Sequence, residues 1–167
     1  VVDTLCASLG QGLLVWHACQ KRDAGMGFDE LVQWLEDNKL NLCMWFTVDD
    51  LMFLKRGGRI SKGVTLAGGL LSIKPVIAMS EEGKMEMIGK ARGNKQANAL
   101  MDAKIREMGI DWDKPCMLGY TGTSDELLCK YRAQSKIWTG DVFCSVVSGV
   151  VGTHAGPGAV AVAFFKN

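Results

Sequence analysis

The sequence lacks the features that mark several large classes of protein. No apolar run approaches the roughly 18–20 residues of a membrane-spanning helix, and the longest, AVAVAFF, fits a buried strand. The formal net charge is only +1, so no broad basic surface for nucleic acid is expected. Apolar residues make up 48% of the chain and charged residues 22%. This composition is typical of a globular protein with a core.

Clustered cysteines are absent as well. The six cysteines are spread singly along the chain, without a CxxC pair: Cys6, Cys19, Cys43, Cys116, Cys129 and Cys144. Disulfide frameworks and zinc sites usually cluster their cysteines. We therefore expect reduced thiols, no metal site and a cytoplasmic protein.

The familiar catalytic motifs are missing too. The chain contains no GxSxG elbow, no HExxH and no GxxxxGK[ST] loop, which excludes the commonest serine-hydrolase, zinc-peptidase and nucleotide-binding signatures. No residue is predicted to be catalytic, and no cofactor is implied. The chain opens on VVDTLCAS without a methionine, so we expect a preceding segment in the full-length protein.

Apolar spacing along the chain predicts alternating strands and helices. Strands are expected at 1–8, 40–48, 73–79, 84–91, 116–122, 141–147 and 158–165. Helices are expected at 10–24, 28–38, 49–58, 64–72, 94–108 and 124–134, with Asp49 or Asp50 at the start of the 49–58 helix. A turn at SEEG makes the strands on either side a hairpin. The repeated βα order argues for an α/β fold, with antiparallel pairing near that hairpin.

The stretch KRGGRIS, residues 55–61, is one candidate for chemistry. Lys55, Arg56 and Arg59 surround the pair Gly57–Gly58, and consecutive glycines can let backbone N–H groups converge on an anion. The alternative is a helix C-terminus whose solvated basic residues complement the helix dipole. The spacing alone favours the helix end.

The stretch GTHAGPG is the second candidate. Gly152, Gly156 and Gly158 leave space around His154, and Pro157 stiffens the turn. An imidazole can donate one hydrogen bond and accept another. The glycines favour close approach by a ligand or another chain, but a loop histidine bound to a backbone carbonyl fits equally well.

Two further features have plain structural interpretations. His17 lies in the apolar stretch GLLVWHACQ and is predicted to be a half-buried core histidine. The nine methionines can line an adaptable apolar cavity, although methionine more often fills ordinary core.

Five motifs, in order and over essentially the whole chain, resemble the DegV family of bacterial fatty-acid-binding proteins. They are DTLCASLGQGLLV, FTVDDLMFLKRGGRIS, GGLLSIKPVIAM, GKARGNKQA and GTHAGPGAVAVAFF. The resemblance implies two α/β domains with a long-chain fatty acid between them, its tail in an apolar tunnel and its carboxylate near the surface. It also implies a non-enzymatic carrier that presents the carboxylate to a fatty acid kinase for acyl-phosphate formation.

The same resemblance assigns residues to the ligand and to the partner. It implies that His154, with Gly152 and Gly156 around it, lies near the carboxylate. The residues assigned to partner or phosphate contacts are all basic: Arg59, Arg92, Lys55 and Arg56.

The chain departs from the family at its beginning. The family's N-terminal portion, with a Thr/Ser-rich segment that also holds the carboxylate, is missing. Residues 1–50 resemble the closing part of the first domain, and 51–167 the second domain. The stretch TGTS, residues 121–124, is predicted to be a helix N-cap rather than a replacement for the missing hydroxyls.

Two other functions stay open from the sequence alone. One is an enzyme that acts on a phosphorylated or acyl substrate at KRGGRIS. The other is an assembly domain whose glycine-rich turn contacts another subunit. No nucleic-acid partner is expected, and peripheral or transient membrane contact is left open.

Overall fold

The computed structural model describes residues 1–60 and 73–167. The described residues form six α-helices and a short 3-10 helix: α1 (Ser8–Asp23), α2 (Phe28–Asn38), η1 (Lys39–Asn41), α3 (Leu51–Arg56), α4 (Gly93–Met108), α5 (Glu126–Gln134) and α6 (Gly149–Ala155). Six strands accompany them: β1 (Leu42–Thr47), β2 (Ile73–Met79), β3 (Met85–Arg92), β4 (Cys116–Tyr120), β5 (Val142–Val146) and β6 (Val160–Phe165). The helix predicted at 64–72 lies outside the described residues.

The six strands form one sheet in the order β3-β2-β1-β6-β4-β5. Only β4 and β5 pair in parallel, and the other neighbours are antiparallel. The α/β class is confirmed, but the sheet is more antiparallel than the βα order suggested. Strand β1 lies between β2, the next strand along the chain, and β6, the last strand, and it pairs with both in antiparallel fashion. Which strands become neighbours is decided by packing of the whole chain, not by their local pattern.

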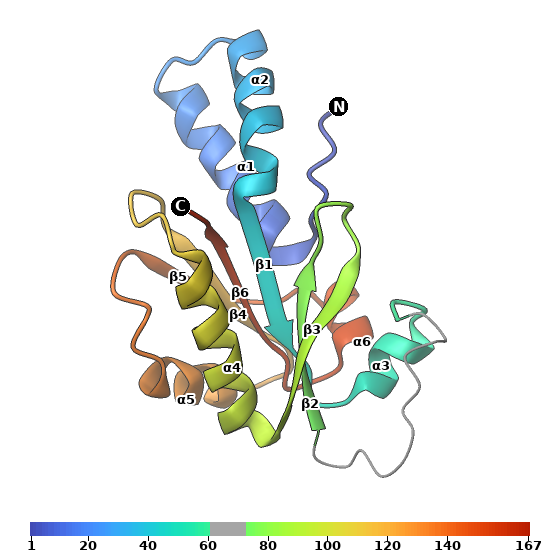
Figure 1. Ribbon diagram of the computed structural model, residues 1–167. Helices are drawn as coiled ribbons and strands as arrows, with labels where there is room; N and C mark the ends of the chain where they lie inside the picture. The colour runs from blue at the N-terminus through green and yellow to red at the C-terminus, as the bar shows by residue number, and fades with distance from the viewer. Residues whose placement is uncertain (61–72) are drawn as a thin grey trace.

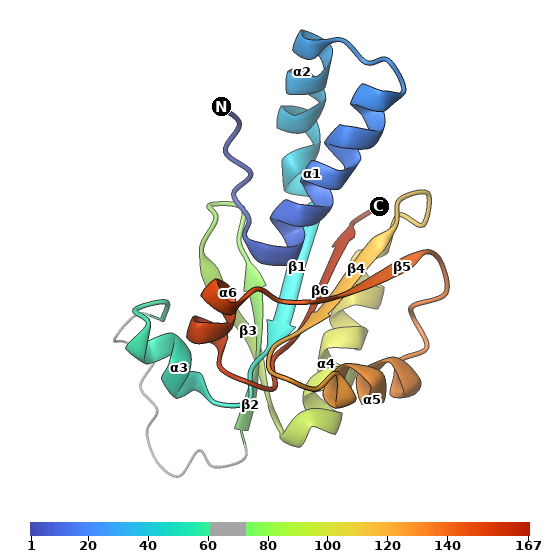
Figure 2. The same ribbon diagram turned by 180° about the vertical axis from the view of Figure 1, so that it is seen from behind.

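Helices cover both faces of this sheet (Figures 1 and 2). Side chains alternate along β1: Met44 and Phe46 join the core beneath α1, α3 and α6, which we call the α1 face. Cys43 and Trp45 join the core beneath α4 and α5, which we call the α4 face. Strands β1 and β6 are buried throughout, because apolar side chains on both of their faces have helices to pack against.

Strand β1 precedes the predicted domain boundary at residue 50, yet it is central in the sheet formed with later strands. Helices α1 and α2 extend together beyond one end of the sheet, near the C-terminus (Figure 1). The division of the chain at residue 50 stays a prediction.

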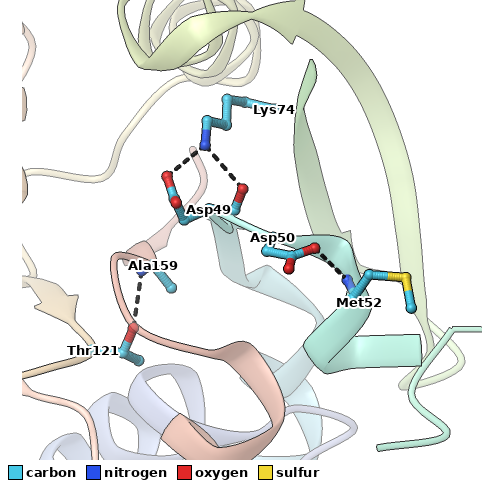
Figure 3. Close-up of polar contacts among 6 residues, drawn as sticks. All are labelled: Asp49, Asp50, Met52, Lys74, Thr121 and Ala159. Atoms are coloured by element: carbon cyan, nitrogen blue, oxygen red, sulfur yellow. Dashed lines mark hydrogen bonds and ion pairs between the residues drawn. The ribbon is translucent and has the colours of Figure 1, made fainter. Parts of the chain in front are cut away.

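Several local predictions are confirmed. Helix α4 covers the predicted 94–108 segment, and β2 and β3 form the predicted hairpin. Asp50 caps α3, where its carboxylate accepts a hydrogen bond of 2.8 Å from the Met52 backbone N–H (Figure 3). Such a cap satisfies one of the free N–H groups of a helix N-terminus.

The strand predicted at 1–8 is wrong. Residues 1–7 form no regular structure, and α1 begins at Ser8. Leu5 and Ser8 both have a φ of 51°, in the left-handed region that an extended strand cannot contain. An apolar segment with strand-like composition is therefore not paired in the part of the chain that the structure describes.

Candidate functional site

A cavity of about 230 Å³ lies on the α1 face, between the start of α1, helix α3 and helix α6. Most of its lining is apolar, and includes Met44, Phe46, Leu54, Met79, Met85 and Ala161. Three of the nine methionines therefore border a cavity, as one of the two sequence interpretations allowed. Flexible thioether side chains suit a wall that must adapt to an apolar ligand.

Four polar residues border the same cavity: Ser8, Arg59, Thr121 and His154. Two of them, Arg59 and His154, belong to the KRGGRIS and GTHAGPG motifs, which lie far apart in the chain. Because Arg59 and His154 border one cavity, the site combines an apolar interior with hydrogen-bond donors. Such a site can hold a ligand with an apolar body and a polar or anionic end.

The histidine lies in a helix and not in a loop. The predicted glycine-rich turn is partly wrong, because residues 149–155 form α6 and place half-buried His154 in its last turn. Gly156 follows with a φ of 75° and a ψ of 172°, a positive-φ conformation that glycine adopts without strain and that other residues rarely reach. The helix C-terminus also favours a positive charge nearby.

Two glycines let α3 and α6 approach each other closely. A Cβ at Gly57 would overlap the Nδ1 atom of His154, and a Cβ at Gly156 would lie 2.5 Å from the ring of Phe53. Gly57 therefore provides the space for the imidazole, a role that sequence analysis did not assign. Gly156 shapes the helix packing and does not border the cavity.

Gly152 contributes little to the shape of the site. It lies within α6, and a Cβ there would be in ordinary contact, 4.0 Å from the Thr121 methyl group. The predicted ligand role of Gly152 and Gly156 stays a prediction, and neither residue borders the cavity.

Thr121 ties the end of β4 to the turn that follows α6. Its hydroxyl donates a hydrogen bond of 2.5 Å to the carbonyl of Gly156. The same hydroxyl accepts one of 2.9 Å from the N–H of Ala159, which Figure 3 shows. The backbone adds a bond of 3.1 Å from the Thr121 N–H to the Ala159 carbonyl. A turn fixed at both ends holds His154 in a defined position.

The N-cap predicted within TGTS is misplaced by one residue, because the N-cap of α5 is Asp125, which makes no side-chain cap hydrogen bond. Ser124 accepts a hydrogen bond of 3.2 Å from the N–H of Glu126 at the start of α5. Thr121 is buried instead and bonded across the sheet end, so its role was missed. A threonine directly after a buried strand was the available signal, but its partners lie more than 30 residues away.

The glycine pair in KRGGRIS ends α3. The N–H groups of Gly57, Gly58 and Arg59 donate to carbonyls of the helix, at 2.9, 3.1 and 2.9 Å respectively. Because these donors are already occupied, they cannot converge on an anion. The helix-end interpretation is therefore confirmed, and the backbone anion nest is wrong.

The basic residues of the two motifs separate in space. Arg59 borders the cavity while remaining exposed, and its guanidinium donates a bond of 2.7 Å to the Gly57 carbonyl. Lys55 and Arg56 are exposed in the last turn of α3. Arg92 is exposed at the N-cap of α4 and does not border the cavity. Their assignment to a partner stays a prediction.

His17 is a core residue, as predicted. Its ring meets Phe165 edge to face, with 5.0 Å between ring centres, and its Nε2 has no hydrogen-bond partner. Burial, helped by the positive charges of Lys114 and Lys21, lowers the pKa of His17 to about 4 against the opposing effect of Asp111. A neutral, buried imidazole outside the cavity supports the fold and does not contribute to the site.

Across 1–60 and 73–167, no group of three or more metal-ligating side chains is close enough to hold an ion. Nor does any helix in that part of the chain have the length and apolar character needed to cross a bilayer.

Comparison with known proteins gives consistent results. The model of the DegV family, described as an uncharacterised protein family, matches residues 1–167. A DegV domain-containing protein of Clostridium perfringens is 36% identical, over 100% of this chain and 58% of its own length. The chain thus spans well under two thirds of that relative.

Solved structures have the same fold. A fatty acid binding DegV family protein of Streptococcus agalactiae is 32% identical with a TM-score of 0.84, over 100% of this chain and 59% of its own. The Fatty Acid Kinase (Fak) B3 protein of Streptococcus pneumoniae, loaded with linoleic acid, has a TM-score of 0.87 at 23% identity. That match covers 100% of this chain and 59% of the pneumococcal one. The Streptococcus agalactiae protein is described as fatty acid binding, and the pneumococcal protein carries a fatty acid in its structure.

Proposed function

The chain belongs to the DegV family, and we propose that it binds a long-chain fatty acid through the cavity on the α1 face. One observation carries the proposal: an apolar cavity with His154 and Arg59 at its border. The fatty acids bound by structural neighbours support the same ligand class.

The acyl tail supplies most of the affinity in this proposal. Each methylene removed from water contributes roughly 0.8 kcal/mol, so even part of a tail in the cavity gives useful binding. A cavity of about 230 Å³ takes only part of a long tail. We propose that the rest of the tunnel is formed by the part of the full-length family protein that this chain does not span.

The carboxylate is proposed to bind near His154. An anion in a poorly hydrated site is costly unless it is hydrogen-bonded or paired. The imidazole can donate to it in either charge state, and the guanidinium of Arg59 can add a charge-assisted bond.

A fatty acid kinase is proposed as the partner. The support is the exposed basic group formed by Lys55 and Arg56 on α3, with Arg92 separate at the start of α4. The pneumococcal neighbour's name points to the same class of enzyme. We place the protein in the bacterial cytoplasm, since its six cysteines are free and such thiols suit a reducing compartment.

The deciding experiment measures the lipid directly. Full-length protein purified from cells should carry a fatty acid in native mass spectrometry. After delipidation and refolding, it should bind saturated and unsaturated long-chain fatty acids in isothermal titration calorimetry, with a negative heat-capacity change from apolar burial. Well-folded, lipid-free protein that binds no member of the panel would contradict the proposal.

A further inference from the structure

Lys74 lies near the start of β2 and holds the residue that leads into α3. Its Nζ donates to the backbone carbonyl of Asp49 at 2.9 Å and also pairs with the Asp49 carboxylate (Figure 3). The Lys74 side chain is only 13% exposed, whereas that of Asp49 is 52% exposed. Because an ion pair with so exposed a partner adds little stability, the two contacts matter more for the position of Asp49 than for the stability of the fold.

The backbone of Lys74 is well fixed, so its side chain can act as an anchor. Lys74 is paired with Ala91 of β3, and the residue before a proline is restricted to extended conformations. That proline, Pro75, is fully buried in the sheet. A side chain that reaches out from such a position holds its partner in place relative to the sheet.

Asp49 lies between the two elements that carry polar residues of the α1-face cavity. On one side the chain continues through Asp50, the N-cap of α3, and α3 leads to Arg59. On the other side Asp49 packs against the turn after α6, because a Cβ at Gly158 would lie 3.3 Å from the Asp49 Cβ. His154 is in the last turn of α6. A displacement of Asp49 would therefore reach both Arg59 and His154.

The turn after α6 is also held by Thr121, whose carbonyl accepts a bond of 3.1 Å from the Gly158 N–H. Neither Lys74 nor Asp49 borders the α1-face cavity, so neither is placed to touch a ligand there. Any effect of these two residues on a ligand must pass through the positions of α3 and α6.

We infer that Lys74 is a positioning residue, which acts through Asp49 to place His154 and Arg59 against the head group of the ligand. The inference rests on the proposed function for the identity of that ligand, a fatty acid. The apolar wall formed by Met44, Phe46 and Ala161 belongs to β1 and β6. This wall should keep its shape without the Lys74 contacts.

The test compares Lys74→Met with Lys90→Met in the full-length protein. Methionine keeps much of the length and the apolar stem of lysine but cannot donate a hydrogen bond. Lys90 is exposed and lies opposite Pro75 on β3, so this control removes the same charge one strand away. The imidazole signals of His154, assigned with His154→Gln, are compared by two-dimensional NMR in the lipid-free protein.

We expect the His154 signals to shift in Lys74→Met and to stay in place in Lys90→Met. Lys74→Arg keeps a donor and should return them toward their original positions. Asp49→Asn leaves the backbone carbonyl available to Lys74 and should shift them less. The double variant should match Lys74→Met alone, because both changes act through one contact.

Palmitic acid and cetyl alcohol, which share the same tail, separate the head group from the tail. Lys74→Met should weaken binding of the acid roughly five- to tenfold, the size of one ordinary hydrogen bond. Binding of the alcohol should change little, because it depends mainly on the tail. A residue that only supported the fold would weaken both ligands to the same extent.

Unmoved His154 signals in a folded Lys74→Met protein would overturn the inference, and so would equal shifts in Lys90→Met. Equal weakening of the acid and the alcohol would overturn it as well. If Lys74→Met does not fold, Asp49→Asn gives the same comparison. The NMR measurement needs no lipid, so a protein that binds no fatty acid would refute the proposed function while the His154 signals still decide the role of Lys74.

Discussion

His154 is the residue on which the proposed carboxylate site depends most. Glycines surround it, and the imidazole occupies space that Gly57 leaves free, so removing the ring should cost little packing. We expect His154→Ala to weaken fatty-acid binding tenfold or more, corresponding to a bond of about 1.5–3 kcal/mol to a charged group. His154→Gln keeps a donor and should weaken it less.

Calorimetry and thermal unfolding of both variants separate this role from a structural one. A histidine that only pins the turn would show the reverse pattern, with lower stability and little change in affinity. Unchanged affinity in a well-folded alanine variant would contradict the assignment.

His17 should make the protein less stable in mild acid. Its pKa is about 4 in the folded protein and near 6.5 in an unfolded chain, so the unfolded state binds the extra proton between these values. The free energy of unfolding should therefore fall as the pH drops from 6.5 toward 4, by up to about 3 kcal/mol from this group.

His17→Leu provides the comparison for this pH effect. The variant replaces an imidazole whose Nε2 is unpartnered, and its urea unfolding should lack this component of the pH dependence. Carboxylates titrate in both proteins, so the difference between the two profiles isolates the histidine. Parallel profiles from pH 7 to pH 4.5 would show that burial does not shift its pKa.

At the scale of elements, the turn between α6 and β6 depends on Thr121. Thr121→Val keeps the shape but removes the hydroxyl that bonds Gly156 and Ala159. We expect a loss of about 1–3 kcal/mol in the free energy of unfolding, because buried backbone groups are left unpaired. Fatty-acid affinity should fall severalfold as His154 loses its fixed position.

Thr121→Ser is the natural control for this prediction, since it retains the hydroxyl. Its stability and affinity, measured by urea unfolding and calorimetry, should remain closer to those of the unaltered protein. Equal losses in the serine and valine variants would mean that the methyl group, and not the hydrogen bonds, matters.

Elements with strong local signals were predictable, and long-range arrangements were not. The apolar period of α4 and the Asp50 cap of α3 depend only on residues that are close together in the chain. The pairing of β1 with β6 and the bond from Thr121 to Gly156 join residues far apart, and no local pattern encodes them. The strand predicted at 1–8 failed for the same reason, because strand-like composition requires a partner strand.

The candidate site was predictable in its composition but not in its construction. His154 and Arg59 were named from two motifs, and the structure brings both to one cavity. The roles of Gly57 and Thr121 depend on the contact between α3 and α6 and on the end of β4. Those contacts exist only after packing, so the sequence could not assign them.

At the scale of the whole molecule, ligand contact and partner contact should be separable. Arg92 is exposed and away from the cavity, whereas Arg59 borders it. We expect Arg92→Ala to leave the melting temperature and fatty-acid affinity unchanged while impairing phosphorylation of the bound lipid by its kinase. Arg59→Ala should reduce lipid affinity as well.

Arg106→Ala, at an exposed position on the helix α4 that Arg92 precedes, is the charge control, and its bound lipid should be phosphorylated normally. Assays of the full-length protein with its kinase measure all three variants. Normal phosphorylation with Arg92→Ala would remove this residue from the docking surface.

The pairing of β1 with β6 also determines when the protein can fold. Their register joins Leu42 to Phe165 and Thr47 to Val160, so the centre of the sheet closes a loop of more than 110 residues. Non-local pairing of this kind slows folding, because loop closure comes before the contacts that reward it. During synthesis, the edge of the apolar β1 that pairs with β6 stays open until β6 has been made. The centre of the sheet is therefore expected to close late, with an exposed strand edge that chaperones would recognise.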